Sequence, residues 1–504
     1  TMVASGVGVC FANPGTTEMA LVRALDAVPG IRGVLGLFEG VCSGAADGYA
    51  RMAGQPAMGL FHLGPGFANA VANLHNARRA RSPVVNVVGD QATWHRGADA
   101  PLTSDIASLA RPVSRWVRAA TSARALAQDA AEAVAAAKGG GAGVATLIVP
   151  SDCQTDEAGG PVRPVAAEPR RAVPGSRVEE VAAALRGRSR AALVLGGRAL
   201  LERGQRAAAR VAAATGCRML SECFPARQER GAGLPRIERV PYFPERALAS
   251  LAGLEILVLA GAAEPVAFFG YPGLPSRLAP PGCALLMLAS PEEDVEGGLD
   301  ALADALAAGN PAVAPARRVD MPADGPLTPD AVGAVLALSQ PEGAIVVEES
   351  GTTGLRYFGP AAASPRHTLL TLTGGSIGMG PPCATGAAIA CPDRVVVGFQ
   401  GDGGAMYTLQ ALWTQAREQL HVVTLLCANR HYRILEMELA RAGGAAGPQA
   451  LGLTDLSRPP LDWVSLARGM GVPGTRVETV ASLREALGHA LAEAGPYLVE
   501  VVVA

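Results

Sequence analysis

Short, uninterrupted apolar runs alternate with helix-like segments along all 504 residues of the chain. The runs are rich in Val, Leu and Ile, and include residues 56–63, 83–90, 191–197, 254–261, 343–350 and 420–430. Such runs are typical of strands buried on both faces, which occur in parallel sheets covered by helices. The pattern therefore predicts an α/β protein built from mainly parallel sheets flanked by helices.

Two segments rich in Pro, Gly and Arg interrupt this alternation, at residues 159–175 and 310–327. Compositions of this kind are typical of exposed linkers between domains. They divide the chain into three parts of ordinary domain size, residues 1–158, 176–309 and 328–504. We expect three α/β domains.

The charged residues exclude several classes of function. Lys138 is the only lysine and stands before three glycines, so neither a pyridoxal Schiff base nor a Walker A loop is expected. The formal net charge is −2 and no basic tract is present. We therefore expect no nucleic-acid partner and no polybasic membrane contact.

Cysteine usage and hydropathy bear on the compartment. The nine cysteines are odd in number and include no C-x-x-C pair, which indicates free thiols in a reducing cytosol. No apolar run approaches the roughly 20 residues of a membrane span, and the first residues lack a basic leader. We expect a cytoplasmic protein without a membrane partner.

The most informative motif lies in residues 395–432. A buried strand ends in Gly401-Asp402-Gly403-Gly404, and the next strand ends at Asn429. Glycines after a strand allow backbone N–H groups to approach a phosphate, and Asp402 adds a carboxylate at the same edge. Oxygen ligands beside a phosphate favour Mg²⁺. The alternative is a strand-end turn with ordinary caps.

This motif resembles the diphosphate and metal motif of thiamine diphosphate (ThDP) enzymes. The resemblance implies that Asp402 and Asn429 bind Mg²⁺ through side-chain oxygens and that His431 binds it through its main-chain carbonyl. The family usually has Asn-Asn where this chain has Ala428-Asn429, and the ligand falls on the second position. ThDP and Mg²⁺ are the cofactors implied.

Glu39 lies between a strand-like run and a helix-like segment with the sequence VCSGAADGYAR. The order resembles the segment that carries the catalytic glutamate in the decarboxylase branch of the family. Glu39 would then hold the cofactor's aminopyrimidine in its reactive form. The alternative is a carboxylate favoured by a helix N-terminus.

The resemblance implies further cofactor contacts. In the glycine-rich segment 374–380, Gly375 would contact the aminopyrimidine through its carbonyl, and Ile377 would hold the cofactor bent. After the strand-like run 343–349, Thr352 would donate its hydroxyl to the diphosphate. The alternative for both segments is a glycine-rich turn with core packing.

Two strings in the first part bear on the substrate. Residues 13–18 (NPGTTE) resemble a loop of benzoylformate decarboxylase in which Thr16 would contact the substrate, and His62 matches an active-site histidine of that enzyme. Residues 64–66 and 86–116 are more similar to acetolactate synthase. A structural role for His62 is the alternative. Residues 266–273 of the middle part lack the second histidine of the decarboxylase.

The resemblance covers nearly the whole chain and implies a lyase or transferase. The leading hypothesis is an acetolactate synthase-like enzyme that decarboxylates a 2-oxo acid to a carbanion-enamine and ligates it to a carbonyl acceptor. One alternative is a benzoylformate decarboxylase-like enzyme that releases an aldehyde. Another is a non-catalytic regulatory paralogue.

The family also implies an assembly. We expect a homodimer or homotetramer with active sites at the subunit interface, Glu39 and Asp402 of one site coming from different chains. Acetolactate synthases hold FAD in the middle domain, but residues 193–198 (LVLGGR) are too generic to support FAD here.

Overall fold

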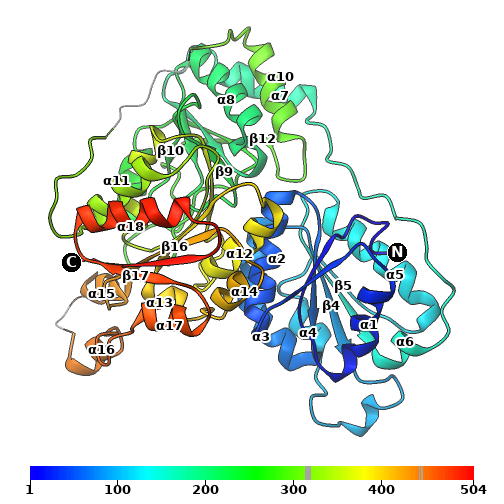
Figure 1. Ribbon diagram of the computed structural model, residues 1–504. Helices are drawn as coiled ribbons and strands as arrows, with labels where there is room; N and C mark the ends of the chain where they lie inside the picture. The colour runs from blue at the N-terminus through cyan, green and yellow to red at the C-terminus, as the bar shows by residue number, and fades with distance from the viewer. Residues whose placement is uncertain (313–318, 442, 444–445, 504) are drawn as a thin grey trace. The chain divides into compact units, whose positions relative to one another are not determined.

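The computed structural model describes residues 1–312, 319–441, 443 and 446–503 (Figure 1). That part of the chain contains three sheets, whose neighbouring strands run parallel, with helices packed against them. Contacts divide the chain into two compact units. The first unit holds Thr1–Lys138, Ala142–Ala167 and Arg318–Ala504, and the second holds Gly139–Gly141 and Glu168–Arg317. The predicted α/β class with mainly parallel sheets is confirmed.

The N-terminal sheet of the first unit has six strands in the order β2-β1-β3-β4-β6-β5. The strands are β1 (Val9–Asn13), β2 (Arg32–Leu35), β3 (Ala57–Phe61), β4 (Val84–Asp90), β5 (Trp116–Ala119) and β6 (Val144–Pro150). The helices are α1 (Met19–Ala27), α2 (Glu39–Ala53), α3 (Leu63–Ala80), α4 (Ile106–Ala110), α5 (Ala123–Lys138) and α6 (Ser151–Thr155).

Both faces of this sheet are buried, as the apolar runs predict. Phe11 of β1 packs in a core with residues of α2, α3 and α4. Its neighbours Cys10 and Ala12 point to the opposite face, into a core formed with α5 and flanked by α1. Successive side chains of a strand alternate between faces, so a fully apolar strand requires helices on both sides.

The C-terminal sheet of the first unit runs in the order β17-β18-β16-β15-β13-β14. The strands are β13 (Ile345–Glu349), β14 (His367–Thr371), β15 (Val396–Gly401), β16 (Val422–Ala428), β17 (Gly474–Val477) and β18 (Tyr497–Val502). The helices are α11 (Pro329–Ser339), α12 (Gly380–Ala390), α13 (Asp402–Ala405), α14 (Ala411–Arg417), α15 (Arg433–Arg441), α16 (Pro448–Gly452), α17 (Trp463–Gly469) and α18 (Val480–Ala492).

Helices α2 and α12 join the two halves of the first unit in close contact (Figure 1). A Cβ at Gly44 would lie 2.6 Å from Pro382 Cγ, and one at Gly48 would overlap the carbonyl of Cys383. On α12, a Cβ at Gly386 would overlap the backbone of Ala45. Glycine at these positions allows the helix backbones to touch, so the N-terminal and C-terminal halves pack as one unit.

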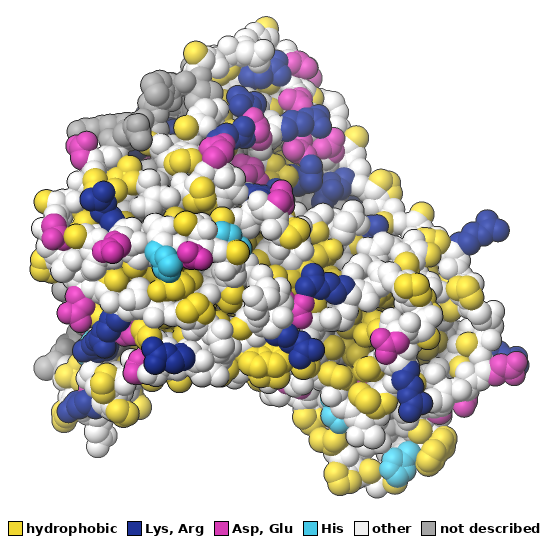
Figure 2. Space-filling view, viewed as in Figure 1, with side chains coloured by type: hydrophobic (Ala, Val, Ile, Leu, Met, Phe, Trp, Pro, Cys, Tyr) yellow, Lys and Arg dark blue, Asp and Glu magenta, His cyan; other side chains and the backbone are white. Residues whose placement is uncertain are grey.

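The second unit has a five-stranded sheet in the order β10-β8-β7-β11-β12. The strands of this sheet are β7 (Ala191–Leu195), β8 (Arg218–Ser221), β10 (Glu238–Arg239), β11 (Ile256–Ala260) and β12 (Ala284–Ala289). The unit also contains the short strand β9 (Gln228–Arg230), outside this sheet, and the helices α7 (Gly175–Leu185), α8 (Glu202–Thr215), α9 (Pro244–Leu251) and α10 (Val295–Ala305). Arg203 and Arg210 of α8 pair with Asp300 and Asp304 of α10. Basic and acidic side chains are accordingly interspersed on the face drawn in Figure 2.

The structure describes the whole of the first predicted linker but only part of the second. Residues 157–170 of the first contain no helix or strand, and α7 begins at Gly175. Residues 313–318 of the second lie outside the described residues, and α11 begins at Pro329.

The nine cysteines are free thiols, as the sequence predicts. Burial raises the pKa of Cys10 and of Cys383 to about 12, so neither thiol has the thiolate character of a nucleophile. Among the described residues, no helix is long and apolar enough to cross a membrane.

Candidate active site

The Glu39 side chain is anchored at the carboxyl edge of the N-terminal sheet. Glu39 is the first residue of α2 and is buried. Its Oε2 accepts a hydrogen bond from Asn69 Nδ2 at 3.0 Å, and its Oε1 accepts one from Asn13 Nδ2 at 3.4 Å. Because Asn69 lies on α3 and Asn13 ends β1, three elements fix the position of this carboxylate.

His62 lies beside Glu39. It follows β3 and directly precedes α3, whose first turn contains Gly66. A Cβ at Gly66 would lie 3.2 Å from Glu39 Oε1 and 3.4 Å from His62 Cβ. The structure thus brings the two predicted catalytic residues together around the first turn of α3, at the edge where ligands bind in parallel sheets.

Three residues of the loop after β1 surround the His62 ring, and the sequence prediction missed their role. Nδ1 of His62 lies 2.8 Å from Glu18 Oε2 and 3.2 Å from Thr17 Oγ1, and Gly15 packs against the ring. Thr16, the predicted substrate contact, is exposed on the same short 3₁₀ turn, Thr16–Glu18. The hydroxyl that reaches His62 is therefore that of Thr17.

The predicted metal residues meet at the carboxyl edge of β15 and β16. The buried carboxylate of Asp402 accepts backbone hydrogen bonds from Gly403 N at 2.9 Å and Arg430 N at 2.7 Å. Asn429 Oδ1 accepts one from His431 N at 3.0 Å, and Arg430 between them has a left-handed φ of 59°. Asp402 is therefore tied directly to the turn that carries Asn429 and His431.

Burial raises the pKa of Asp402, although the two backbone donors oppose the shift. Nδ1 of His431 lies 2.9 Å from Glu436 Oε1, close enough for an ion pair when the imidazole is protonated, but the geometry does not make a hydrogen bond. The main-chain carbonyl of His431 stays the predicted metal ligand, and it lies on the turn that Asp402 holds through Arg430 N.

The donor set fits a hard divalent cation. It consists of a carboxylate, an amide oxygen and a carbonyl oxygen, which are ligands that Mg²⁺ prefers. The described residues contain no cluster of three or more His, Cys, Asp or Glu side chains suited to a metal. A cation here would also offset the cost of burying the charge of Asp402.

The loop before α12, residues 374–380, carries Gly375 and Ile377 and is held on both sides. On one side, the buried carboxylate of Glu349 accepts backbone hydrogen bonds from Gly378 and Gly380. On the other, Asn76 of α3 donates to the Ser376 carbonyl at 2.8 Å. Gly375 has a φ of 76°, which suits glycine. The sequence prediction missed Glu349, whose pKa burial raises to about 7.

The remaining predicted cofactor residues gather at the same edge. Gly401 ends β15, and a Cβ at Gly404 would lie 3.1 Å from Glu349 Oε1. Gly403 packs against the Tyr432 ring, where a Cβ would overlap it. Thr352 is half-buried in the turn after β13. The glycines that flank Asp402 would allow a diphosphate to approach the backbone at this edge.

Glu39 and Asp402 have different direct hydrogen-bond partners. Glu39 is bound by Asn13 and Asn69, whereas Asp402 is bound by Gly403 and Arg430. In the part of the chain that the structure describes, no hydrogen bond or ion pair joins Glu39 to Asp402 or Asn429.

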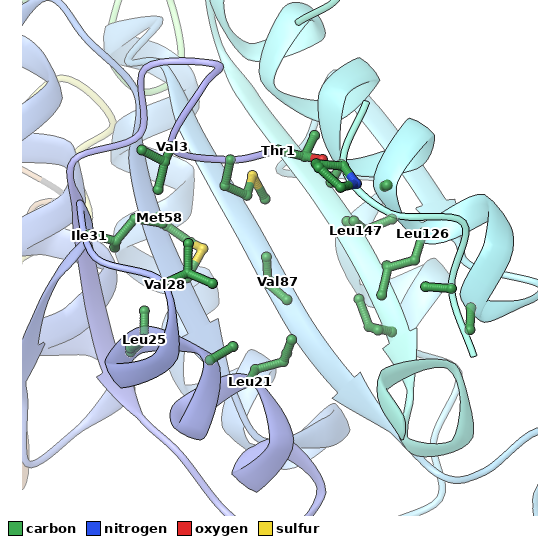
Figure 3. A pocket seen from close by; sticks show the side chains of 18 of the residues that line it. Thr1, Val3, Leu21, Leu25, Val28, Ile31, Met58, Val87, Leu126 and Leu147 are labelled. Atoms are coloured by element: carbon green, nitrogen blue, oxygen red, sulfur yellow. The ribbon is translucent and has the colours of Figure 1, made fainter. Parts of the chain in front are cut away.

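A cavity of about 350 Å³ lies elsewhere, on the face of the N-terminal sheet covered by α1 and α5 (Figure 3). Leu21, Leu25, Met58, Val87 and Leu126 are among its lining residues. No acidic, basic, imidazole or thiol side chain belongs to the lining. The cavity therefore lacks the groups needed for acid–base chemistry.

Comparisons with known proteins agree with this arrangement. Residues 1–109 match the thiamine pyrophosphate enzyme N-terminal TPP-binding domain, and residues 350–501 match the C-terminal TPP-binding domain. A Mycobacterium tuberculosis protein provisionally named acetolactate synthase large subunit IlvX is 51% identical over 100% of this chain and 97% of its own.

Two other relatives are named as decarboxylases. Benzoylformate decarboxylase of Pseudomonas aeruginosa is 30% identical over 98% of this chain and 96% of its own. The structure of a ThDP-dependent 4-hydroxybenzoylformate decarboxylase from Rhodococcus jostii superposes with a TM-score of 0.86, at 26% identity, over 99% of this chain and 97% of that one. The chain therefore belongs to the thiamine diphosphate-dependent enzymes of the acetolactate synthase and benzoylformate decarboxylase type.

Proposed function

We propose that the chain is a ThDP- and Mg²⁺-dependent enzyme that decarboxylates a 2-oxo acid and releases the aldehyde. The observation that carries the proposal is that Glu39 and His62 both lie against Gly66, at the carboxyl edge of the N-terminal sheet. One group can exchange a proton with the cofactor and the other with the substrate.

The chain's residues divide into binding and proton-transfer roles. When bound, ThDP supplies a nucleophilic carbon and an electron sink. Asp402, Asn429 and the His431 carbonyl would hold Mg²⁺ and, with Gly401, Gly403, Gly404 and Thr352, the diphosphate. Gly375 and Ile377 would orient the rings of the cofactor, and Glu39 would exchange a proton with the aminopyrimidine.

Release of an aldehyde requires one proton at the former carbonyl carbon. The bond to the carboxylate breaks, CO₂ leaves, and the electron pair that remains takes up H⁺ to give the aldehyde. His62 is the imidazole at this edge, with Glu18 beside it to support a positive charge. This favours protonation over ligation, and Thr16 remains a candidate substrate contact.

Ligation to a second carbonyl compound is the other candidate, favoured by the 51% identity to the relative named acetolactate synthase. In either case, a homodimer or homotetramer would bring Glu39 of one chain to Asp402 of another. FAD is not required by either reaction.

Product analysis tests the proposal. The purified chain is incubated with ThDP, Mg²⁺ and either benzoylformate or pyruvate, and CO₂ and the organic products are quantified. Aldehyde formed in proportion to CO₂ supports the proposal. Acetoin after acidification of the pyruvate reaction supports ligation instead. Absence of CO₂ from a wider panel of 2-oxo acids would contradict both and favour a regulatory role.

A further inference from the structure

We propose that Glu18 is a positioning residue that fixes the imidazole of His62 in its Nδ1–H form and leaves Nε2 as the nitrogen that exchanges a proton with the substrate. The inference rests on the proposed function for the identity of that substrate only. The tautomer follows from contacts within the chain.

The Glu18 carboxyl group is completely buried and surrounded by donors. It is 0% exposed. Its Oε2 accepts a hydrogen bond from Gly15 N at 2.8 Å, and its Oε1 accepts one from the Thr17 hydroxyl. It also lies directly on β4, where a Cβ at Gly89 would overlap Oε1. The carboxyl group therefore has no room to turn away from these partners.

The Glu18 carboxylate determines which ring nitrogen of His62 carries the proton. An ionised carboxylate can only accept hydrogen bonds, and Oε2 lies 2.8 Å from His62 Nδ1. If Nδ1 carried no proton, two lone pairs would face each other at that distance. With Glu18 as a carboxylate, Nδ1 donates, and any change in the charge of His62 takes place at Nε2.

The loop after β1 also fixes where the ring lies. A Cβ at Gly15 would overlap Cγ and Nδ1 of His62, so only glycine lets the ring pack against this turn. The His62 side chain nevertheless remains 23% exposed. With Nδ1 held by Glu18, the free edge of the ring is the one that bears Nε2.

This arrangement suits a residue that delivers a proton. The imidazolium form has Nε2–H, and the adjacent buried carboxylate stabilises its positive charge. Transfer of that proton to the carbon that has lost CO₂ forms the C–H bond of the aldehyde and leaves neutral His62 in the Nδ1–H form. Water then returns a proton to Nε2.

The tautomer can be measured without any turnover. In the holoenzyme labelled with nitrogen-15 at histidine, solid-state NMR distinguishes protonated from unprotonated ring nitrogens, and His62→Gln identifies the His62 signals. We expect a protonated Nδ1 and, in the neutral form, an unprotonated Nε2. A neutral His62 with its proton on Nε2 would overturn the inference, whether or not the protein is a decarboxylase.

A double-variant cycle separates positioning from structural support. Glu18→Gln keeps the size of the side chain but removes its negative charge, and the atom at the Oε2 position becomes either an uncharged oxygen or an NH2 group that can donate to Nδ1 and no longer accepts from Gly15 N. We expect kcat to fall at least about tenfold with little change in KM. In the His62→Gln background, the same change should cost nothing further, because Glu18 acts through His62.

The outcomes of the cycle are distinct. Equal losses in the two backgrounds, or a loss confined to KM, would mean that Glu18 supports the fold or binds substrate, and would overturn the inference. If the expected tautomer is found in a chain that decarboxylates no 2-oxo acid, the positioning role stands and the proposed function fails.

Discussion

Asp402 combines a buried carboxylate with direct backbone contacts to Gly403 and Arg430. The charge of the side chain is costly at that position unless a cation or a proton offsets it. Its raised pKa has the same cause, which is burial. The amide of Asn429 and the carbonyl of His431 lie on the turn to which Asp402 is bound.

Asp402→Asn should therefore raise the Mg²⁺ concentration needed for half-maximal activity by at least about tenfold, because a neutral amide attracts the cation less strongly. Titration of the apo-protein with Mg²⁺ at saturating ThDP measures this shift. His431→Ala is the matched control, since it removes the imidazole but keeps the main-chain carbonyl. An equal shift in the control would mean that the His431 side chain, not its carbonyl, serves the metal.

Candidate residues at strand ends could be predicted from the sequence. A residue that acts by positioning another side chain could not. Glu39, His62, Asp402 and Asn429 lie in segments that follow strands, which the apolar runs predict, and their roles are implied by the resemblance to ThDP enzymes. Glu18 could not be assigned, because the 3₁₀ turn decides which of the side chains of Thr16, Thr17 and Glu18 point inward. Burial of the whole Glu18 side chain is visible only after folding.

The loop of residues 374–380 shows how one element depends on two others. Glu349, at the end of β13, binds the backbone of Gly378 and Gly380. Asn73 and Asn76 of α3 donate to the carbonyls of Gly378 and Ser376 at 3.2 and 2.8 Å. A loop fixed in this way can present Ile377 rigidly to a cofactor, and its anchors were missed because they come from distant segments.

The raised pKa of Glu349 predicts that the stability of the folded chain depends on pH. Burial raises its pKa from 4.5 to about 7, with the charge of Glu348 adding to the shift and the backbone donors opposing it. Between these two values the folded chain binds more protons than the unfolded chain, so stability falls as pH rises. The contribution is complete below about pH 4.5 and is lost as pH passes 7; it amounts to roughly 3 kcal/mol.

Glu349→Gln removes this titration. We expect the unfolding midpoint of the native chain, relative to that of the variant, to decrease between about pH 5 and about pH 8. Thermal unfolding of both apo-proteins across that range measures the difference. A difference that is constant with pH, or that grows as pH rises, would show that Glu349 is ionised throughout and that its backbone donors outweigh burial.

At the scale of the whole molecule, the apolar runs predicted the sheets and their parallel direction. Strands buried on both faces leave few alternatives to helices on both sides. Spacing along the chain could not predict that the N-terminal and C-terminal halves pack as one compact unit while residues 168–317 form another. That packing depends on Gly44 and Gly48 of α2 meeting α12, a contact that no local pattern encodes.

Among the described residues no hydrogen bond or ion pair joins Glu39 to Asp402, and the family resemblance leads to a prediction about assembly. If a site takes Glu39 from one chain and Asp402 from another, Glu39→Gln and Asp402→Asn chains should each have low activity but complement each other when Mg²⁺ is held near the concentration that half-saturates the native chain. Random pairing at equal amounts gives about one quarter of the native number of intact sites. Co-expression followed by a decarboxylation assay measures recovery. Persistent inactivity of the mixed dimers would place both residues of a site on one chain.

The central claim is that the Glu39 carboxylate activates ThDP, and proton exchange at C2 of the bound cofactor tests it without knowledge of the substrate. The holoenzyme is transferred to D₂O and quenched with acid after milliseconds, and NMR measures the C2 proton that remains. We predict that Glu39→Gln slows the exchange by at least about a hundredfold while ThDP still binds, and that His62→Gln leaves the exchange rate unchanged. Equal exchange rates in the native and Glu39→Gln proteins would contradict the account.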